Sequence, residues 1–328
     1  MRQIKWLLLL TLFLTAVLAT DFYFFATRPQ ALPAQPYQFT LKPGTSLKGA
    51  AQQLQQEGGL SNVRMFVVLA RLLGKSAQIK AGNYVLETAV TPLELLDVLA
   101  KGKGIQSEFS VIEGWTFGQF RAVLNASPAV RHDTAQLSAA EILQRLGVTE
   151  THPEGLFFPD TYHFASGASD LTLFKRAYET MQKHVQQAWQ TREPGLPLES
   201  PYQALILASI VEKETGAARD RGMIAGVFTN RLHKGMLLQT DPTVIYGVGE
   251  KFDGNLKKRD LLADTPYNTY TRAGLPPTPI ALPGLASIQA ALHPAKTDAL
   301  YFVARGDGSS EFSATLAKHN RAVNKYQK

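Results

Sequence analysis

The sequence predicts an α+β protein in three parts: a single N-terminal transmembrane helix, a small β-α-α-β module, and a C-terminal mixed α/β domain. Three observations lead to this prediction. A long apolar run begins at residue 6, short strand and helix patterns alternate over residues 37–87, and a strongly apolar helix pattern from residue 201 is followed by loops dense in Pro, Gly, Asn and Tyr. Of the 328 residues 45% are apolar, which is enough for hydrophobic cores.

The apolar run from Trp6 to Ala26 has 21 residues with one charge, Asp21, and is long enough to span a bilayer as a helix. Arg2 and Lys5 precede it, so the positive-inside rule predicts a cytoplasmic N-terminus and an exported body. The alternative is a cleaved signal peptide, but Ala-Thr-Asp near residue 20 is a poor cleavage site. We therefore expect a single-pass protein of the inner (cytoplasmic) membrane, whose partner over residues 6–26 is the lipid bilayer.

The chain divides into four predicted segments. Residues 1–27 form the cytoplasmic tip and anchor, residues 28–37 a proline-containing linker, residues 38–105 the module, and residues 106–328 a domain whose motif-rich core starts at 201. Within the module, YQFTL and KAGNYVLE have strand patterns, and LKGAAQQLQQEGG and NVRMFVVLARLLG have helix spacing. This β-α-α-β order resembles a LysM-like module.

Further elements follow in order. TPLELLDVLAKGKG predicts a helix with Thr91 as N-cap and Pro92 in its first turn. FSVIEG at 109–114 repeats the pattern of FTLKPG at 39–44, and each leads into a helix; internal duplication and a common strand-turn-helix pattern explain this equally well. Additional helices are predicted at 139–146 and 171–189, and ALYFVAR near the C-terminus predicts a strand.

Charge and composition limit the function classes. The chain carries 34 Lys and Arg against 27 Asp and Glu, a net charge of +7, which suits an anionic polymer or surface. No dense basic patch is interleaved with aromatic residues, so we expect no nucleic-acid partner. The absence of cysteine excludes disulfides and thiolate chemistry. His233, His293 and His319 have no metal-ligand spacing, so we expect neither a metal nor a cofactor.

The segment ALILASIVEKETG brings Glu212 and Glu214 to the end of an apolar helix. At the helical repeat they point about 200° apart and cannot act as a neighbouring pair. Glu214 continues the bulky apolar stripe of Leu207, Ile210 and Val211. A carboxyl group leaving such a stripe is partly desolvated, which raises its pKa and suits a general acid. We therefore favour Glu214 for catalysis and keep Glu212 as the second choice; two solvated glutamates at a helix end are the non-functional alternative.

The longer motifs carry a resemblance. LASIVEKETG, VFTNRLHKGMLLQTDPTVIYGVG, TPYNTYTRAGLPPTPIALPG, HPAKTDALYFVA and FSATLAKHN occur in this order, after the anchor and the module. Together they make the chain similar to the MltG-type (YceG-like) endolytic murein transglycosylases, over residues 38 to 325.

The resemblance implies an activity. Members of this family cut nascent peptidoglycan strands internally between N-acetylmuramic acid and N-acetylglucosamine, without water, and leave a 1,6-anhydro end. Their catalytic glutamate resembles that of lysozyme-like lytic transglycosylases, in which a helix ends in Glu-Ser; the matching dipeptide here is Glu214-Thr215. The family acts with peptidoglycan synthases, which implies such partners at the membrane.

The loops that follow the glutamates offer candidate substrate-binding groups. Amide, hydroxyl, carboxylate and aromatic groups alternate there, the mixture that carbohydrate clefts use; the candidates are Asn230, Arg231, Gln239, Asp241, Tyr267, Asn268 and Tyr270. Each has a structural alternative: loop packing for the tyrosines, a turn cap for Asp241, and a helix-end ion pair for Asn230 and Arg231.

Two other function classes stay open. The chain could be a non-catalytic, membrane-anchored scaffold that binds peptidoglycan, although a scaffold does not need the dense polar motifs after residue 201. Ser209 and Lys213 lie one helical turn apart, as in a Ser-Lys peptidase, but no oxyanion-hole glycine run or nucleophile elbow accompanies them.

Overall fold

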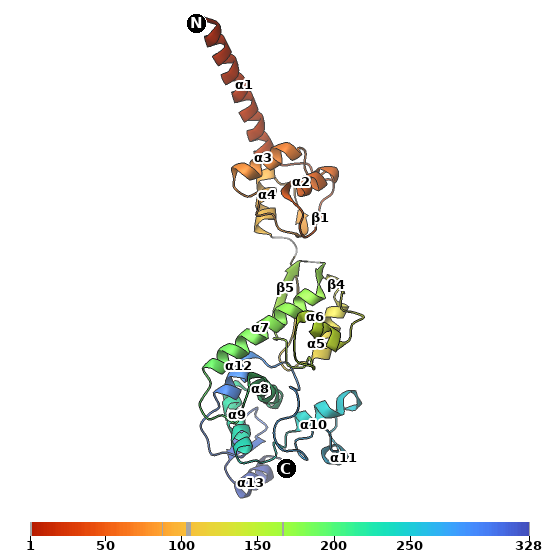
Figure 1. The fold of residues 1–328 in the computed structure, drawn as a ribbon, viewed down its shortest axis with the longest axis vertical. Helices are drawn as coiled ribbons and strands as arrows, with labels where there is room; N and C mark the ends of the chain where they lie inside the picture. Colours follow the sequence, from red (N-terminus) through yellow and green to blue (C-terminus); the bar gives the residue numbers. More distant parts are fainter. Residues whose placement is uncertain (1, 87, 103–105, 166, 328) are drawn as a thin grey trace. The chain divides into compact units, whose positions relative to one another are not determined.

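The computed structural model describes residues 2–86, 88–102, 106–165 and 167–327 (Figure 1). It contains two compact units, unit 1 with residues 1–108 and 163–168, and unit 2 with residues 109–162 and 169–328. The mixed α/β class with one N-terminal apolar helix is confirmed. The predicted module boundary at residue 105 lies outside the described residues, as do the chain ends Met1 and Lys328.

Unit 1 has the β-α-α-β order that the sequence predicts. Its elements are α1 (Arg2–Thr27), β1 (Tyr37–Leu41), α2 (Leu47–Gln56), α3 (Val63–Leu72), β2 (Gly82–Leu86) and α4 (Pro92–Lys101). Strands β1 and β2 pair antiparallel, with Tyr37 opposite Leu86 and Leu41 opposite Gly82. Alternate residues of β1 point inward, which buries Tyr37, Phe39 and Leu41 against the helices.

Helix α1 joins the core of unit 1 directly. Its residues Leu9–Thr27 are long and apolar enough to cross a membrane. Phe25 and Ala26 in its last turn are buried, and Phe22 packs against the same core. The segment after α1 also lies along unit 1, because the backbone N–H of Gln30 donates to the carbonyl of Val90 at 2.9 Å.

Unit 2 is mainly helical. Its elements, of which β3, β5 and β6 lie partly in unit 1, are β3 (Gln106–Ser110), α5 (Phe117–Ala126), β4 (Val130–Arg131), α6 (Ala139–Leu146), β5 (Thr161–Ala165), β6 (Ala168–Ser169), α7 (Asp170–Gln190), α8 (Pro201–Glu214), α9 (Ala218–His233), α10 (Asp241–Val248), η1 (Gly249–Lys251), α11 (Lys258–Leu262), α12 (Leu285–Leu292), β7 (Tyr301–Ala304), β8 (Ser310–Ser313) and α13 (Leu316–Tyr326). Strands β7 and β8 form an antiparallel pair in which Tyr301 lies opposite Ser313.

Helix α8 is the centre of unit 2. It contacts α7, α9, α10 and α12, and every residue from Ala204 to Val211 is buried. A helix that is apolar on all sides is stable only inside a protein, which explains this position. The Ser200 side chain caps its N-terminus by accepting from the N–H of Gln203, and Pro201 occupies its first turn. The helix therefore presents its last residue, Glu214, from a rigid base.

Several local predictions are confirmed. The helix after Thr91 begins with a capping box to Glu94, and helices occupy 139–146 and 170–190. The two similar segments, 39–44 and 109–114, both end in a glycine with positive φ, +81° at Gly44 and +79° at Gly114, and both lead into a helix. Glycine adopts this left-handed conformation without steric cost, which is the physical basis of the shared pattern.

Candidate active site

A cavity of about 510 Å³ lies at the C-terminal end of α8. It brings together side chains from α8, α9, the start of α10, the loop after α11, strand β7 and helix α13. The residues with polar side chains that line it are Glu214, Arg231, Gln239, Asp241, Tyr270, Tyr301, Ser310, His319 and Gln327. Five of these, up to Tyr270, are among the residues predicted from the sequence.

Glu214, the last residue of α8, is one of the two carboxyl groups that line this cavity; the other is Asp241. Its Oε1 accepts a hydrogen bond from the hydroxyl of Thr240. Burial raises the pKa of Glu214, and the charge of Asp241 raises it further, while the Thr240 hydrogen bond and the charge of Arg231 lower it. The net direction is upward, so the protonated carboxyl persists to higher pH than in an exposed glutamate. This is the property that a general acid requires.

Thr240 is held by a small network of buried hydroxyl groups. Its N–H donates to Thr269 Oγ1 at 3.1 Å, and its carbonyl accepts from Thr243 Oγ1 at 2.8 Å. The hydroxyls of Thr243 and Thr269 lie 2.9 Å apart. The preceding residue, Gln239, has φ +48°, a left-handed conformation that is uncommon for residues other than glycine. Thr240 therefore approaches Glu214 from a fixed backbone rather than from a mobile loop.

Arg231 connects the cavity to the surrounding backbone. Its Nε donates to the carbonyl of Leu300 at 2.7 Å, and its Nη1 donates to the carbonyl of Leu238 at 2.7 Å. The guanidinium carbon lies 5.2 Å from the ring centroid of Tyr301. Arg231 is buried and remains a cation, which makes it the main source of positive potential near Glu214.

Asp241 and Tyr270 form a hydrogen-bonded pair at the edge of the cavity. The Tyr270 hydroxyl donates to Asp241 Oδ1 at 2.5 Å. Burial first, and then this hydrogen bond and the charge of Asp241, raise the pKa of Tyr270, so its hydroxyl stays protonated. Both side chains line the same cavity as Glu214.

Sequence reasoning missed the contribution of the C-terminal segment. Tyr301 on β7 and His319 on α13 line the cavity, with ring centroids 5.3 Å apart and ring planes 24° from parallel. Burial and the charge of Arg231 lower the pKa of His319. From the sequence alone, this histidine is weighed only as a metal ligand. Its place in the motif FSATLAKHN was the signal that could have identified it. Thr240 was likewise part of a recognised polar turn but was not selected.

Glu212 lies elsewhere. Its Oε2 accepts from the N–H of Gly284, the N-cap residue of α12, at 2.9 Å. The neighbouring carboxyl of Glu113 also packs on Gly284, where a Cβ would overlap its Oε1. Burial first, and then the charge of Glu212, raise the pKa of Glu113. The two glutamates of α8 thus point to different surroundings, as their spacing predicts, and only Glu214 reaches the cavity.

Three of the predicted binding residues do not line the cavity. They hold in place the backbone segments that carry residues of its lining. The Asn230 side chain donates to the carbonyls of Thr297 and Ala299 at 2.9 and 3.0 Å. Asn268 is fully buried, donates to the backbone of residues 260–263, and accepts from the N–H of Tyr270. The Tyr267 ring packs against the ring of Tyr246, with the two ring centroids 4.9 Å apart. Their contacts hold the segments that carry Arg231 and Tyr270.

The Ser-Lys peptidase alternative has no geometric support. Ser209 is fully buried; its hydroxyl donates to the carbonyl of Ile206 at 2.7 Å and accepts from the N–H of Ile280 at 3.0 Å. Lys213 instead donates to the carbonyl of Gly114 at 3.3 Å. A nucleophile needs access to substrate, which a buried and doubly bonded hydroxyl does not have.

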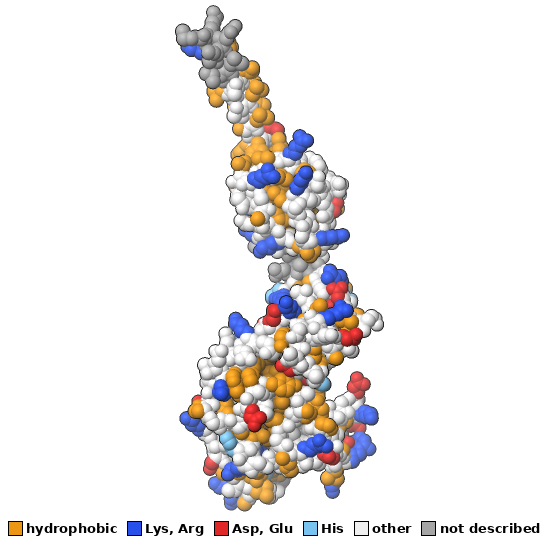
Figure 2. All heavy atoms as spheres, in the orientation of Figure 1, with side chains coloured by type: hydrophobic (Ala, Val, Ile, Leu, Met, Phe, Trp, Pro, Cys, Tyr) orange, Lys and Arg blue, Asp and Glu red, His pale blue; other side chains and the backbone are white. Residues whose placement is uncertain are grey.

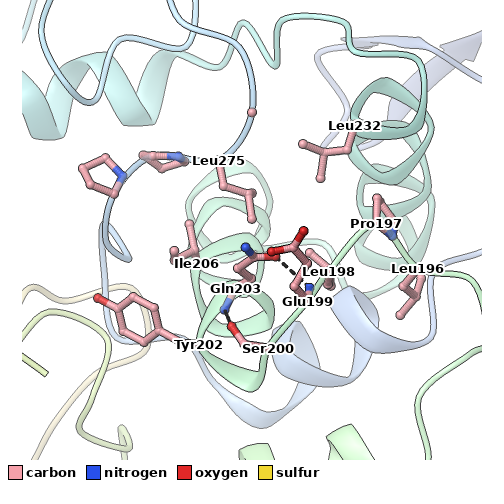
Figure 3. A pocket seen from close by; sticks show the side chains of 13 residues that line it. Leu196, Pro197, Leu198, Glu199, Ser200, Tyr202, Gln203, Ile206, Leu232 and Leu275 are labelled. Carbon is pink, nitrogen blue, oxygen red and sulfur yellow. Dashed lines mark hydrogen bonds between the residues drawn. The ribbon is translucent and has the colours of Figure 1, made fainter. Parts of the chain in front are cut away.

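A larger hollow of about 780 Å³ lies at the other end of α8 (Figure 3). Its walls combine apolar side chains, among them Ile206, Leu232 and Leu275, with polar ones from the segment 199–203. The Ser200 hydroxyl and the Gln203 amide that face it are engaged with backbone N–H groups at the start of α8. The carboxyl that lines this hollow, Glu199, is exposed, whereas Glu214 accepts a hydrogen bond from Thr240 and has a pKa raised by burial, so the chemistry favours the Glu214 cavity.

No cluster of three or more potential metal-ligating side chains occurs within the described ranges.

A family model of the YceG-like family matches residues 39–325. The chain belongs to the YceG-like family. The match includes every residue of the Glu214 cavity except Gln327.

Three relatives of this YceG-like chain extend the comparison. A Bacillus subtilis (strain 168) protein named endolytic murein transglycosylase is 34% identical over 300 residues, 86% of this chain and 82% of that protein. A Streptococcus pneumoniae protein of the same name is 28% identical over 314 residues, 85% of this chain and 56% of that protein, so the chain spans about half of the pneumococcal relative. The crystal structure of a yceG-like protein from Listeria monocytogenes has 29% identity and a TM-score of 0.56, and the match covers 88% of this chain and 98% of that one.

Proposed function

We propose that the chain is an endolytic lytic transglycosylase that cleaves the bond between N-acetylmuramic acid and N-acetylglucosamine in nascent peptidoglycan. The observation that carries the proposal is Glu214, a carboxyl with a pKa raised by burial that lines a polar cavity and accepts a hydrogen bond from Thr240. The relatives from B. subtilis and S. pneumoniae are named endolytic murein transglycosylases, which supports the same substrate class.

The proposed reaction needs one carboxyl in two roles. Protonated Glu214 donates its proton to the glycosidic oxygen, and the bond from the muramoyl C1 to that oxygen breaks, releasing the 4-hydroxyl of N-acetylglucosamine. The Glu214 carboxylate then accepts the proton of the muramoyl 6-hydroxyl while that oxygen bonds to C1. The product is a 1,6-anhydromuramoyl end, the carboxyl is regenerated, and no water is consumed. A hydrolase would use a second carboxylate to activate water or attack C1. Asp241 is the other carboxylate that lines the cavity, and in the proposed reaction it has neither role; its Oδ1 accepts from the Tyr270 hydroxyl.

The neighbouring groups fit this scheme. The Thr240 hydroxyl fixes the carboxyl rotamer, and Arg231 supplies positive potential that stabilises the carboxylate formed in the first step. Burial and the charge of Asp241 raise the pKa of Glu214, which favours the protonated resting carboxyl, while the charge of Arg231 lowers that pKa. Gln239, Tyr270 and Tyr301 line the same cavity and offer an amide and aromatic faces to sugar rings.

The N-terminal half supplies location and substrate contact in this proposal. Helix α1 anchors the protein in the inner membrane with the body on the outer side, and the β-α-α-β module of unit 1 acts as a LysM-like glycan-binding module. The substrate strands emerge from peptidoglycan synthases at the membrane, which are the expected partners. The alternative is a membrane-anchored scaffold that binds peptidoglycan without cutting it.

The test is mass spectrometry of uncrosslinked peptidoglycan strands incubated with the full-length protein in detergent. We expect products that end in 1,6-anhydromuramic acid, lost with Glu214→Gln and retained with Glu212→Gln, a matched change of the neighbouring carboxyl. Reducing ends would identify a hydrolase instead. Intact strands with the wild-type protein, together with retained binding to them, would favour the scaffold.

A further inference from the structure

Unit 1 begins where the proposed membrane span ends. Phe25 and Ala26 are 9% and 7% exposed because they belong to the unit 1 core, whereas Phe24 beside them is 42% exposed. From Trp6 to Phe24 a helix is about 27 Å long, close to the roughly 30 Å of a bilayer's hydrocarbon core. No spacer therefore separates the span from unit 1, and the surface of unit 1 next to α1 meets the lipid headgroups if α1 is the anchor.

Helix α3 contacts α1 and carries an unusual exposed face. Val68, Leu72 and Leu73 are 45%, 71% and 44% exposed. Arg64 and Arg71 are exposed on the same helix. Positions 64, 68, 71 and 72 fall on one side of a helix by their spacing. We call these four residues the α3 face; Leu73, the C-cap residue, follows the helix. Figure 2 shows hydrophobic and basic side chains together at the end of unit 1 that α1 enters.

The charges around the α3 face have one sign. Residues 58–86 contain four Lys and Arg and neither Asp nor Glu. Lys75 pairs with Asp97 of α4, whereas Arg64 and Arg71 form no ion pair with another described residue. Apolar side chains bordered by arginines are the pattern of helices that lie in the membrane interface, where the apolar groups enter the acyl boundary and the guanidinium groups bind phosphate.

We propose that the α3 face docks onto the outer surface of the bilayer that α1 spans, with Val68 and Leu72 among the headgroups and Arg64 and Arg71 bound to anionic lipid phosphates. The proposal rests on the proposed membrane anchoring and is independent of the transglycosylase reaction. Docking fixes the orientation of unit 1 at the membrane through two contacts, α1 and the α3 face.

Single-cysteine labelling tests this directly, because the natural chain has no cysteine. The full-length variants Phe13→Cys, Leu72→Cys and Lys42→Cys are labelled with an environment-sensitive fluorophore and reconstituted into vesicles of phosphatidylethanolamine and phosphatidylglycerol. Phe13 lies on the exposed surface of α1, and Lys42 is exposed after β1, which Figure 1 shows at the end of unit 1 away from α1. All three positions are exposed in the protein, so the substitutions leave the fold intact.

We expect nitroxide lipids to quench the Phe13 label at the bilayer centre and the Leu72 label at headgroup depth, and to leave the Lys42 label unquenched. The double variant Arg64→Gln, Arg71→Gln should lose the Leu72 quenching and retain the Phe13 quenching. Quenching at Phe13 without quenching at Leu72 would overturn the docking and leave the anchor. An unquenched Phe13 label would overturn the anchoring itself. Leu72 quenching that persists in the double variant would overturn the role of the arginines.

Discussion

The hydroxyl of Thr240 donates a hydrogen bond to Oε1 of Glu214. The two residues are 26 positions apart, and the contact exists because the Thr240 backbone is fixed by the hydroxyls of Thr243 and Thr269. A carboxyl group at a helix end has several rotamers, and this bond selects the one that faces the cavity. The hydroxyl of Thr240 can therefore be removed by substitution while the carboxyl group of Glu214 is left unchanged.

Thr240→Val should lower kcat/KM for strand cleavage by about 10- to 100-fold, the usual worth of a hydrogen bond to a charged group. The bond lowers the pKa of Glu214, so its loss raises that pKa and moves the alkaline limb of the pH–rate profile to higher pH. Thr240→Ser keeps the hydroxyl and should restore both the rate of cleavage and the position of the alkaline limb. If Thr240→Val lowers the rate but leaves the alkaline limb at the wild-type pH, Thr240 does not act on the pKa of Glu214 and has only a structural role.

Asp241→Asn should move the alkaline limb of the pH–rate profile to lower pH, the opposite direction to Thr240→Val. The charge of Asp241 raises the pKa of Glu214, so an isosteric amide lowers that pKa, and the active protonated form is lost at lower pH. The amide introduced by this substitution retains an oxygen that can accept from the Tyr270 hydroxyl. The measurement is kcat/KM against pH for the wild type and the variant in parallel. A limb that stays in place would show that Asp241 does not act on Glu214 through its charge.

Glu154 should make the stability of unit 2 depend on pH. Its carboxyl is 4% exposed, accepts from the Phe117 N–H at 2.9 Å and from the Tyr246 hydroxyl at 3.1 Å, and burial raises its pKa to about 7. The folded chain keeps this proton between pH 4.5 and about 7, where the unfolded chain releases it. Up to about 3 kcal/mol of stability is therefore present below the unfolded pKa and is lost as pH rises through the folded one.

Thermal unfolding of Glu154→Gln from pH 5 to pH 8 measures this effect, since glutamine does not titrate. We expect a flatter dependence of Tm on pH than in the wild type. Glu179→Gln, a change of an exposed carboxyl on α7, is the control and should follow the wild-type curve. Parallel curves for all three proteins would contradict the assignment to Glu154.

Gly226→Ala on α9 should destabilise unit 2 by about 1 to 3 kcal/mol, the usual cost of overpacking. A Cβ there would lie 2.7 Å from the carbonyl oxygen of Ala295 and 2.9 Å from Thr297 Cγ2. Gly222→Ala on the same helix is the matched control, because its Cβ would lie 3.8 Å from Ala295, an ordinary contact, and alanine favours the helix. Chemical denaturation of the two variants compares them, and equal midpoints would contradict the close packing.

The helices and strands that could be predicted from the sequence are those specified by residues close together in the chain. Helix α4 with its Thr91 capping box and the apolar helix α8 follow from spacing and caps within about 15 residues. The divergence of Glu212 and Glu214 also followed from helical geometry alone. These features depend little on the rest of the chain, which is why one sequence is enough to predict them.

The parts that escaped prediction depend on tertiary packing. Tyr301 and His319 lie 87 and 105 positions after Glu214 in the sequence, and they reach the cavity because Asn230 and Arg231 bind the backbone of residues 297–300. Asn268 had the composition of a sugar-binding residue, yet its amide is used within its own loop. A polar side chain in a motif can serve substrate or backbone, and only the fold distinguishes the two.

The burial of Phe25 and Ala26 affects how the protein can be produced. A soluble fragment cut at residue 28 or 36 lacks both side chains and also Phe22, which packs on the same core. Such a fragment would expose a hydrophobic hole in unit 1 and would tend to self-associate. A fragment that keeps the last two turns of α1, with the outward-facing apolar residues replaced by polar ones, preserves the unit without the bilayer.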